Sequence, residues 1–286
     1  MPSPAPIPAA SSDAPSVLVI RPESSRSLGL VADLWAFRDL LWSLADRDLR
    51  LRYRQTVLGV AWVVLQPVLG ALIFTFVFGV VAGLESDGAP YFLFTFASLA
   101  GWGLFAGILS RASGSLVQNS PLIAKVWFPR AVLPASTVPA ALLDFAVALI
   151  VLVGLMLWQG IAPTPTMLLM PLWVLGIVTL ALGLGLVGAA LMVSYRDVQH
   201  ILPVATQLLL YASPVAYAVA NVPARYRSLY YLNPLAPLLE GLRASLLGTP
   251  MPPANTIAWA AVVSLGAFVL GAFVFRRLER RFADVI

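Results

Sequence analysis

The chain has 286 residues, of which 60% are hydrophobic and only 11% are charged. A soluble domain keeps about 25% charged residues to cover its surface, so lipid must cover much of this apolar mass. The net charge of +5 reflects basic residues in loops that stay cytoplasmic, so no nucleic-acid partner is expected. With no cysteine and a single histidine, His200, the sequence excludes disulfides, thiolate sites and histidine-rich metal sites.

The N-terminal residues 1–30 are rich in Pro, Ala and Ser and have no basic segment ahead of an apolar one. This composition predicts a disordered cytoplasmic tail rather than a cleavable signal peptide. The remainder, residues 31–286, is predicted to be one transmembrane domain.

An amphipathic helix is predicted over residues 31–54. Its apolar residues recur at steps of three and four: Leu30, Leu34, Phe37, Leu41 and Leu44. Such a helix lies in the cytoplasmic membrane interface, with Trp35 and Trp42 at the level of the lipid headgroups. Arg47, Arg50 and Arg54 are its candidate interfacial residues.

Six apolar stretches approach or exceed the roughly 20 residues that a helix needs to cross the hydrocarbon core. They cover residues 55–84, 91–110, 133–158, 167–193, 201–219 and 256–275. The predicted fold class is therefore an all-α integral membrane protein with six transmembrane helices. Residues 111–130 are mixed in character and are predicted to be a loop with a short amphipathic helix.

Two apolar pieces between the last two spans, residues 226–232 and 235–247, are each too short to cross a membrane. Asn233 and Pro234 separate them, and proline forbids one continuous helix at that point. We expect residues 223–248 to form a re-entrant helical hairpin in the outer leaflet. Glu240 and Arg243 lie one turn apart on its second helix and are expected to pair.

The basic residues set the orientation, because cytoplasmic loops carry an excess of Lys and Arg. If both termini lie inside, fifteen of the 18 Lys and Arg residues are cytoplasmic, and only Arg225, Arg227 and Arg243 lie outside. This orientation predicts Glu85 and Thr164 outside, and Lys125 and His200 inside.

The sequence contains no nucleotide-binding or catalytic pattern. Its only lysine is Lys125, so no Walker A motif exists. The glycines at positions 183, 185 and 188 match a dinucleotide pattern, but they lie within an apolar span and favour close helix packing.

Asp144 is the one acid within a predicted span. Burying an ionisable group in a membrane is costly, which makes a functional role one hypothesis. The alternative is a structural hydrogen bond near the cytoplasmic third of the membrane. Tyrosines around the hairpin are open to two interpretations as well, an aromatic belt at the interface or a stack for sugar rings.

Three segments resemble the permeases of type-2 ABC exporters, especially those for O-antigen, capsule and teichoic-acid polymers. Residues 47–59 with Trp62, Gln66 and Pro67 resemble the start of the first span in that family. Residues 119–123 with Lys125, Phe128, Pro129 and Arg130 resemble its cytoplasmic coupling helix, and residues 233–237 with Glu240 and Arg243 its outer gate helices.

The resemblance implies a pore-forming subunit in the bacterial inner membrane that moves a lipid-linked polysaccharide. It implies a second copy of the chain, two ATP-binding cassette subunits and membrane lipids as partners, with ATP and Mg on the ATPase subunits and no cofactor on this chain. Within residues 118–131, the ATPase-coupling residues would be Pro121, Leu122, Ile123, Lys125, Val126, Trp127, Phe128, Pro129 and Arg130. The gate and substrate path would include Tyr226, Tyr230, Tyr231, Asn233, Pro234, Glu240 and Arg243.

Three alternatives have different requirements. An ABC permease for another lipid or a small molecule would share these segments. An ion-coupled secondary transporter should show repeats and several buried ionisable groups, and a membrane-embedded transferase needs a cluster of acids, histidines or a nucleophile. The sequence shows neither of these last two patterns.

Overall fold

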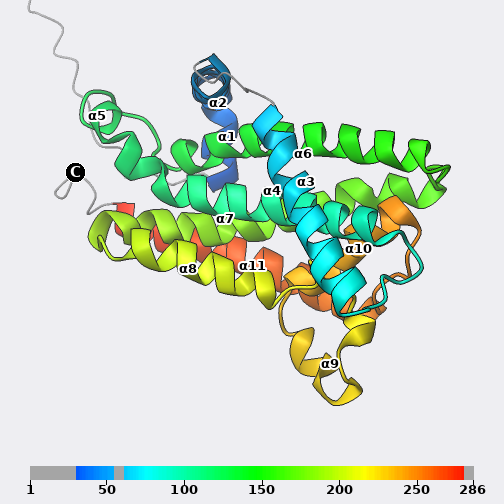
Figure 1. Ribbon diagram of the computed structural model, residues 1–286. Coiled ribbons are helices and arrows are strands. Elements are labelled where there is room, and N and C mark those ends of the chain that lie inside the picture. The colour runs from blue at the N-terminus through cyan, green and yellow to red at the C-terminus, as the bar shows by residue number, and fades with distance from the viewer. Residues whose placement is uncertain (1–29, 55–60, 280–286) are drawn as a thin grey trace, which may run out of the picture.

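The computed structural model describes residues 30–54 and 61–279, and every regular element in these two ranges is helical (Figure 1). The all-α class predicted from the sequence is confirmed. The predicted tail lies outside the described residues except for Leu30, and so do residues 55–60 of the first predicted span.

The helices follow the predicted segments in order along the chain. They are α1 (Leu30–Ala36), α2 (Arg38–Arg54), α3 (Ala61–Phe74), η1 (Thr75–Val81), α4 (Tyr91–Gln118), α5 (Ser120–Ile123), α6 (Val132–Trp158), η2 (Pro165–Leu169), α7 (Met170–Ser194), α8 (Val198–Tyr211), η3 (Val219–Asn221), α9 (Ala224–Tyr230), α10 (Leu235–Leu247) and α11 (Ala254–Glu279). The π-helix η1 continues α3 directly, and the 3-10 helix η2 leads directly into α7.

Five helical segments are long and apolar enough to cross a membrane: Ala61–Val81, Tyr91–Gln118, Val132–Trp158, Pro165–Ser194 and Ala254–Glu279. The remaining predicted span, residues 201–219, is α-helical only in α8, whose 14 residues extend about 21 Å. Turns and bends follow Tyr211. The sixth span thus stays a prediction, and α8 covers part of it.

The helix α4 lies at the centre of the bundle and packs against α6 and α7. Its close approach to α7 depends on glycine: a Cβ on Gly185 would lie 2.7 Å from the Cβ of Ala112 on α4. On another face of α7, a Cβ on Gly183 would lie 2.5 Å from the backbone nitrogen of Phe268 on α11. These residues confirm that the glycine pattern serves close helix packing.

One boundary was predicted wrongly, because α4 continues to Gln118 through residues assigned to a loop. The charge of Arg111 marked the expected end of the span. In the structure Arg111 forms an ion pair with Asp144 on α6, so the helix can carry this charge without ending. The next residues, Ala112 to Leu116, are buried in the bundle.

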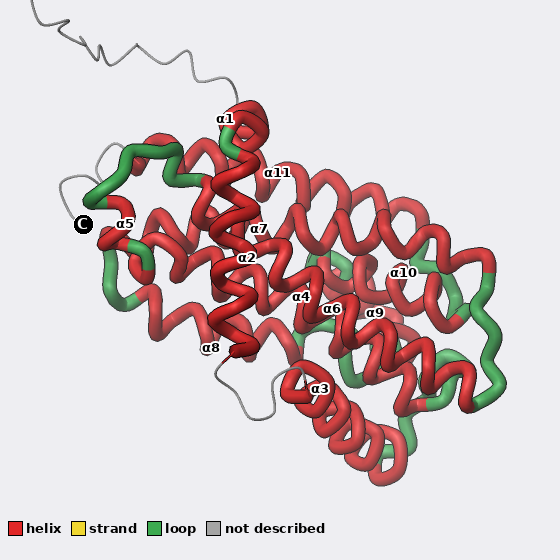
Figure 2. The backbone as a smooth tube through the Cα atoms, turned by 90° about the horizontal axis from the view of Figure 1, so that it is seen from above, coloured by secondary structure: helices red, strands yellow, loops and turns green. Residues whose placement is uncertain are grey.

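The predicted amphipathic helix exists with one break, a turn at Phe37 between α1 and α2. All five residues of its apolar face belong to a cluster that also contains Leu116, Phe128 and Phe275. Trp35 and Trp42 are exposed, at 72% and 62%. In Figure 2, α2 runs across the long helices rather than along them.

The two ends of the bundle differ. In Figure 1, α5 lies at one end, near the last turn of α11, while α9 and α10 lie at the opposite end. The loop that contains Glu85 lies at the α9 end, because Asn221 Nδ2 donates a hydrogen bond to the carbonyl oxygen of Glu85 (2.9 Å). Thr166 Oγ1 donates to the carbonyl oxygen of Ser245 near the end of α10 (3.3 Å), so the α6–α7 turn lies there too.

Candidate functional sites at the two ends of the bundle

The segment predicted to contact an ATPase forms a short projecting loop. Asn119 ends α4 and precedes α5, a single turn with Pro121 near its start. After this turn, Val126 and Trp127 are exposed at 53% and 86%. Apolar side chains exposed at the end of a membrane protein indicate a surface that another protein or the membrane interface covers.

The other predicted coupling residues anchor the loop or lie at its surface. Phe128 is buried in the cluster beneath α1 and α2, and Leu122 and Ile123 are partly buried against the same cluster. Pro121 and Lys125 are exposed, and Pro129 and Arg130 are half-buried. Arg130 Nη1 donates to the carbonyl oxygen of Glu279 (2.8 Å), which fixes the loop to the end of α11.

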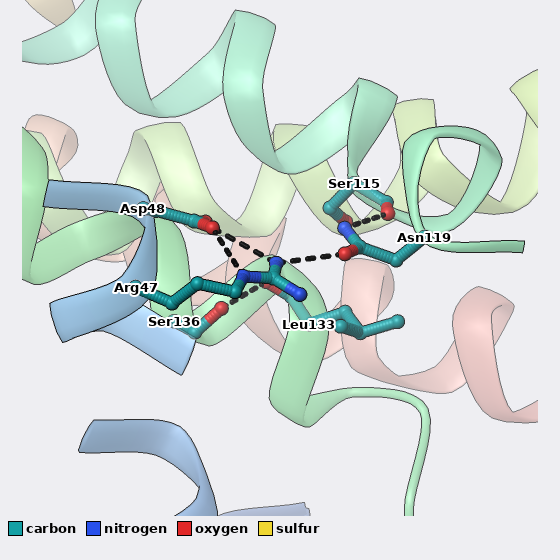
Figure 3. Close-up of polar contacts among 6 residues, drawn as sticks. All are labelled: Arg47, Asp48, Ser115, Asn119, Leu133 and Ser136. Carbon is teal, nitrogen blue, oxygen red and sulfur yellow. Dashed lines mark hydrogen bonds and ion pairs between the residues drawn. The ribbon is translucent and has the colours of Figure 1, made fainter. Parts of the chain in front are cut away.

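Of the predicted interfacial arginines, Arg47 is connected to the coupling segment (Figure 3). Its Nη2 donates to Asp48 Oδ1 and to Asn119 Oδ1, both at 2.8 Å, and Asn119 Nδ2 donates to the carbonyl oxygen of Ser115 at 2.8 Å. Arg50 forms an exposed pair with Asp46 at 2.8 Å. Arg54 ends α2, and its side chain lies outside the described part of the structure.

A turn at Asn233 and Pro234 separates α9 from α10, at the position where the sequence predicted a break. The Asn233 side-chain oxygen accepts from the backbone nitrogen of Leu235 (3.0 Å), and so covers a free N–H at the start of α10. Its amide nitrogen donates to the carbonyl oxygen of Ala212 (3.1 Å) and to Ser213 Oγ (2.9 Å). The turn is thereby attached to the end of α8.

Arg243 is 1% exposed and extends from α10 into the bundle. Its Nη1 donates to Ser98 Oγ on α4 (3.0 Å) and to the carbonyl oxygen of Pro214, and its guanidinium carbon lies 4.0 Å from the centre of the Phe94 ring. The expected pair with Glu240 does not form: no carboxylate of the described residues lies within ion-pair distance of Arg243. The two residues do lie one helical turn apart, but the guanidinium contacts Ser98 and Phe94 on α4 and the carbonyl oxygen of Pro214 instead.

Glu240 is 9% exposed and accepts a hydrogen bond from the hydroxyl of Tyr231 (3.0 Å). Burial raises the pKa of Glu240, although the charge of Arg243 and the Tyr231 hydrogen bond oppose this shift. The carboxyl group is thus held between a tyrosine and a nearby cation without touching that cation.

The hairpin tyrosines are not equivalent. Tyr230 is partly buried, and its hydroxyl donates to Tyr217 (3.2 Å). Tyr226 is 48% exposed, with the guanidinium of Arg225 lying 4.6 Å from its ring centre. Of the three predicted path tyrosines, only Tyr226 presents an exposed ring, whereas Tyr230 and Tyr231 belong to polar contacts within the hairpin.

Asp144, the predicted intramembrane acid, has a partner that sequence reasoning missed. Its Oδ2 lies 3.1 Å from Arg111 Nη1, and the two side chains are 17% and 30% exposed. The available signal was that Arg111 is the one charged residue on the helix preceding the coupling segment. The contact of Asn119 with Arg47 and the roles of Ser98 and Glu279 were also missed, because these contacts join segments far apart in the sequence.

No group of three or more metal-ligating side chains occurs in residues 30–54 and 61–279. The polar groups at both ends instead hold helices and loops in place. An all-helical bundle with five membrane-length helices, an exposed apolar loop at one end and the buried helix α10 at the other is the architecture of a multi-pass membrane protein.

The chain belongs to the ABC-2 type transporter family, whose model matches residues 39–247. It is a permease of that family. It is 32% identical to an O-antigen export system permease protein, RfbA, of Myxococcus xanthus, over 90% of this chain and 99% of the relative. It is 26% identical to an RfbA of Klebsiella pneumoniae (91% and 100%) and 25% identical to the polysialic acid transport protein KpsM of Escherichia coli (82% and 91%).

Proposed function

We propose that the chain is the pore-forming subunit of an ATP-driven exporter that moves a lipid-linked polysaccharide across the bacterial cytoplasmic membrane. The observation that carries this proposal is the similarity along nearly the whole chain to permeases named for O-antigen and polysialic acid transport. The family match covers both the coupling segment and the outer hairpin.

In the proposed assembly, two copies of the chain form the path and two separate subunits bind ATP and Mg. The absence of a Walker A motif supports a separate ATPase. The exposed Val126 and Trp127 support docking of that subunit at the α5 end, which would then be cytoplasmic, together with both termini. The hairpin of α9 and α10 would close the outer end of the path.

The docking surface is tested by substituting Val126 and Trp127 with Ala in the assembled exporter. We expect transport-coupled ATP hydrolysis to fall several-fold while the chain still inserts in the membrane, because the apolar contact is lost. Leu168 is a matched control, since it is 85% exposed at the opposite end. Unchanged coupled hydrolysis in the double variant would place the ATPase contact elsewhere.

The orientation is tested with single cysteines, which report without background because the chain has none. Glu85→Cys and Thr164→Cys should react with an impermeant thiol reagent in intact cells. Lys125→Cys and His200→Cys should react only after the cells are opened. Labelling of Lys125→Cys in intact cells would contradict the proposed topology.

The substrate is tested by expressing the chain with its ATPase subunit in cells that synthesise a lipid-linked polymer but lack an exporter for it. Polymer should appear at the cell surface. Intracellular retention of every polymer tested, with the assembly formed and hydrolysing ATP, would indicate a permease for another substrate.

A further inference from the structure

Two cavities meet at Arg111, in the half of the bundle that contains α5. The first has a volume of about 650 Å³ and lies between α3, α4, α6 and α8. The second has a volume of about 470 Å³ and lies between α2 and the adjoining ends of α4 and α6. Arg111 lines both cavities, so its side chain lies at their junction.

The cavities differ in chemistry. The larger one is mostly apolar, with Phe74, Trp102 and Phe145 among its lining residues. The smaller one is polar: Ser115, Gln118, Asn119 and Thr137 line it beside the ion pair of Arg47 and Asp48. A volume near 650 Å³ is typical of cavities that hold small-molecule ligands. Together the two cavities are complementary to an amphiphilic molecule. Its apolar chain would lie on one side of Arg111 and its polar head on the other.

The local backbone is shaped to hold Arg111 at this junction. Its Nε donates to the carbonyl oxygen of Gly107, one turn earlier on α4 (3.0 Å). A Cβ at position 107 would lie 2.7 Å from Arg111 Nη2, so glycine leaves the space that the folded-back guanidinium occupies. Nη1 reaches Asp144 across the helix interface at 3.1 Å.

Stability does not explain this ion pair well. Replacing a buried ion pair with packed apolar residues is often neutral or stabilising, and ionisable groups within membrane helices usually serve a function. A guanidinium matches the geometry of phosphate as well as that of carboxylate. Asp144 therefore occupies a position beside Arg111 that a phosphate oxygen could take.

We propose that Arg111 binds the phosphate of a lipid whose hydrocarbon chain lies in the 650 Å³ cavity, and that Asp144 competes with this phosphate for the guanidinium. The phosphate belongs either to the lipid carrier of the exported polymer, in which case the inference rests on the proposed function, or to a membrane phospholipid. In both cases the ligand chemistry at Arg111 is the same.

Competition gives the two partners opposite effects, which a purely structural ion pair would not. Arg111→Gln removes the group that binds phosphate and should weaken binding at least about tenfold. Asp144→Asn removes the competing carboxylate and its repulsion of an anion, so binding should become several-fold tighter. Arg111→Lys keeps the charge but loses the bidentate geometry and should lie between wild type and Arg111→Gln.

The test measures binding to the purified full-length chain in detergent micelles. The probes are farnesyl phosphate, phosphatidylglycerol and farnesol, which has the same chain as farnesyl phosphate but no phosphate. Titration followed by the rise in unfolding temperature reports affinity, since a ligand that binds the folded state stabilises it. We expect saturable binding of farnesyl phosphate or phosphatidylglycerol, and at least about tenfold weaker binding of farnesol.

Equal binding of farnesol and farnesyl phosphate would overturn the inference, as would a parallel loss of affinity in Arg111→Gln and Asp144→Asn. If a single variant fails to fold, Arg111→Gln combined with Asp144→Asn removes both charges of the pair and should bind neither phosphate lipid tightly. Tight binding by that double variant would also overturn the inference.

The two phosphate probes identify the source. Stronger binding of farnesyl phosphate supports a carrier-lipid site, and stronger binding of phosphatidylglycerol supports a membrane-lipid site. The assay contains no ATPase subunit, so its failure leaves the export test unaffected. Conversely, lack of polymer export with normal binding at Arg111 would refute the proposed function alone.

Discussion

The two short helices α9 and α10 are both too short to cross a membrane, but they have opposite environments. Every residue of α10 from Leu235 to Leu246 is buried, whereas α9 has no buried residue. Glycines explain part of this difference. A Cβ on Gly241 would lie 2.5 Å from the Trp173 ring of α7, and Gly101 and Gly176 leave space for leucines of α10.

The difference shows that a helix too short to cross a membrane can still be an integral part of the core. Because α10 is buried, adding or removing a single atom on it should change the stability of the fold. Substitutions on the exposed α9 should change stability little. The hairpin therefore divides into a rigid half and a half available for contacts with other molecules. Substitutions on the two helices should separate these roles.

The largest effect is expected for Arg243→Ala on α10. It leaves Ser98 and the Pro214 carbonyl without their donor and opens a cavity beside Phe94, which should lower the free energy of unfolding by about 3 kcal/mol or more. Chemical denaturation in detergent measures this. Arg225→Ala on the exposed α9 is the matched control and should change stability by under about 1 kcal/mol. Equal losses of stability in the two variants would show that α9 and α10 do not differ in how tightly they are packed.

A smaller effect is expected for Gly241→Ala, which forces a methyl group against the Trp173 ring. Overpacking of this kind typically costs about 1–3 kcal/mol. The same substitution at Gly266 on α11 meets no atom within 4 Å and should be neutral or stabilising by up to about 1 kcal/mol. If both alanine variants unfold at the same denaturant concentration as wild type, α10 is less tightly packed than the structure indicates.

Tyr231→Phe removes one hydroxyl from Glu240, whose pKa burial already raises. The hydrogen bond lowers that pKa, so its loss should raise the pKa further and reduce stability by about 1 kcal/mol above the pH at which Glu240 ionises. Below that pH the neutral carboxyl loses less, and the difference between variant and wild type should shrink. A difference independent of pH would exclude the Glu240 contact as its cause.

The smallest effect on stability is expected for Leu229→Ala on α9, because Leu229 is 66% exposed. The free energy of unfolding should stay within about 0.5 kcal/mol of wild type. A large loss of stability in Leu229→Ala would show that α9 is packed against a partner or lipid.

If α9 contacts the exported molecule, Tyr226→Ala should reduce polymer export at unchanged stability, while Tyr226→Phe should keep export at the wild-type level.

Local sequence predicted much of the hairpin and bundle, because apolar length and proline act locally. The bounds of α10 match the predicted piece 235–247, and α6 begins one residue before the predicted span. The predictions that failed depended on contacts between residues far apart in the sequence. The end of α4 depended on Asp144, 33 positions from Arg111, and the partner of Arg243 lies on α4, 145 positions away.

The candidate sites were predicted less completely for the same reason. The coupling segment could be recognised from its residues, but the hydrogen bonds of Arg47 and Arg130 join it to helices from both ends of the described chain. Spacing alone paired Glu240 with Arg243, because a helical pattern contains no information about which helix lies opposite. The length of an apolar segment also did not indicate that α10 is buried and α9 is exposed.

The contact between α7 and α11 has a mechanical consequence. Gly183 and Gly271 bring the two backbones so close that neither helix can slide or rotate past the other without a collision. The pair must therefore move as one lever, with the C-terminal end of α11 joined to the coupling loop through Arg130 and Glu279. A displacement at that loop would be carried along both helices, and the bundle would yield most easily at the segment Ala61–Val81, which has the smallest buried share of the five membrane-length segments.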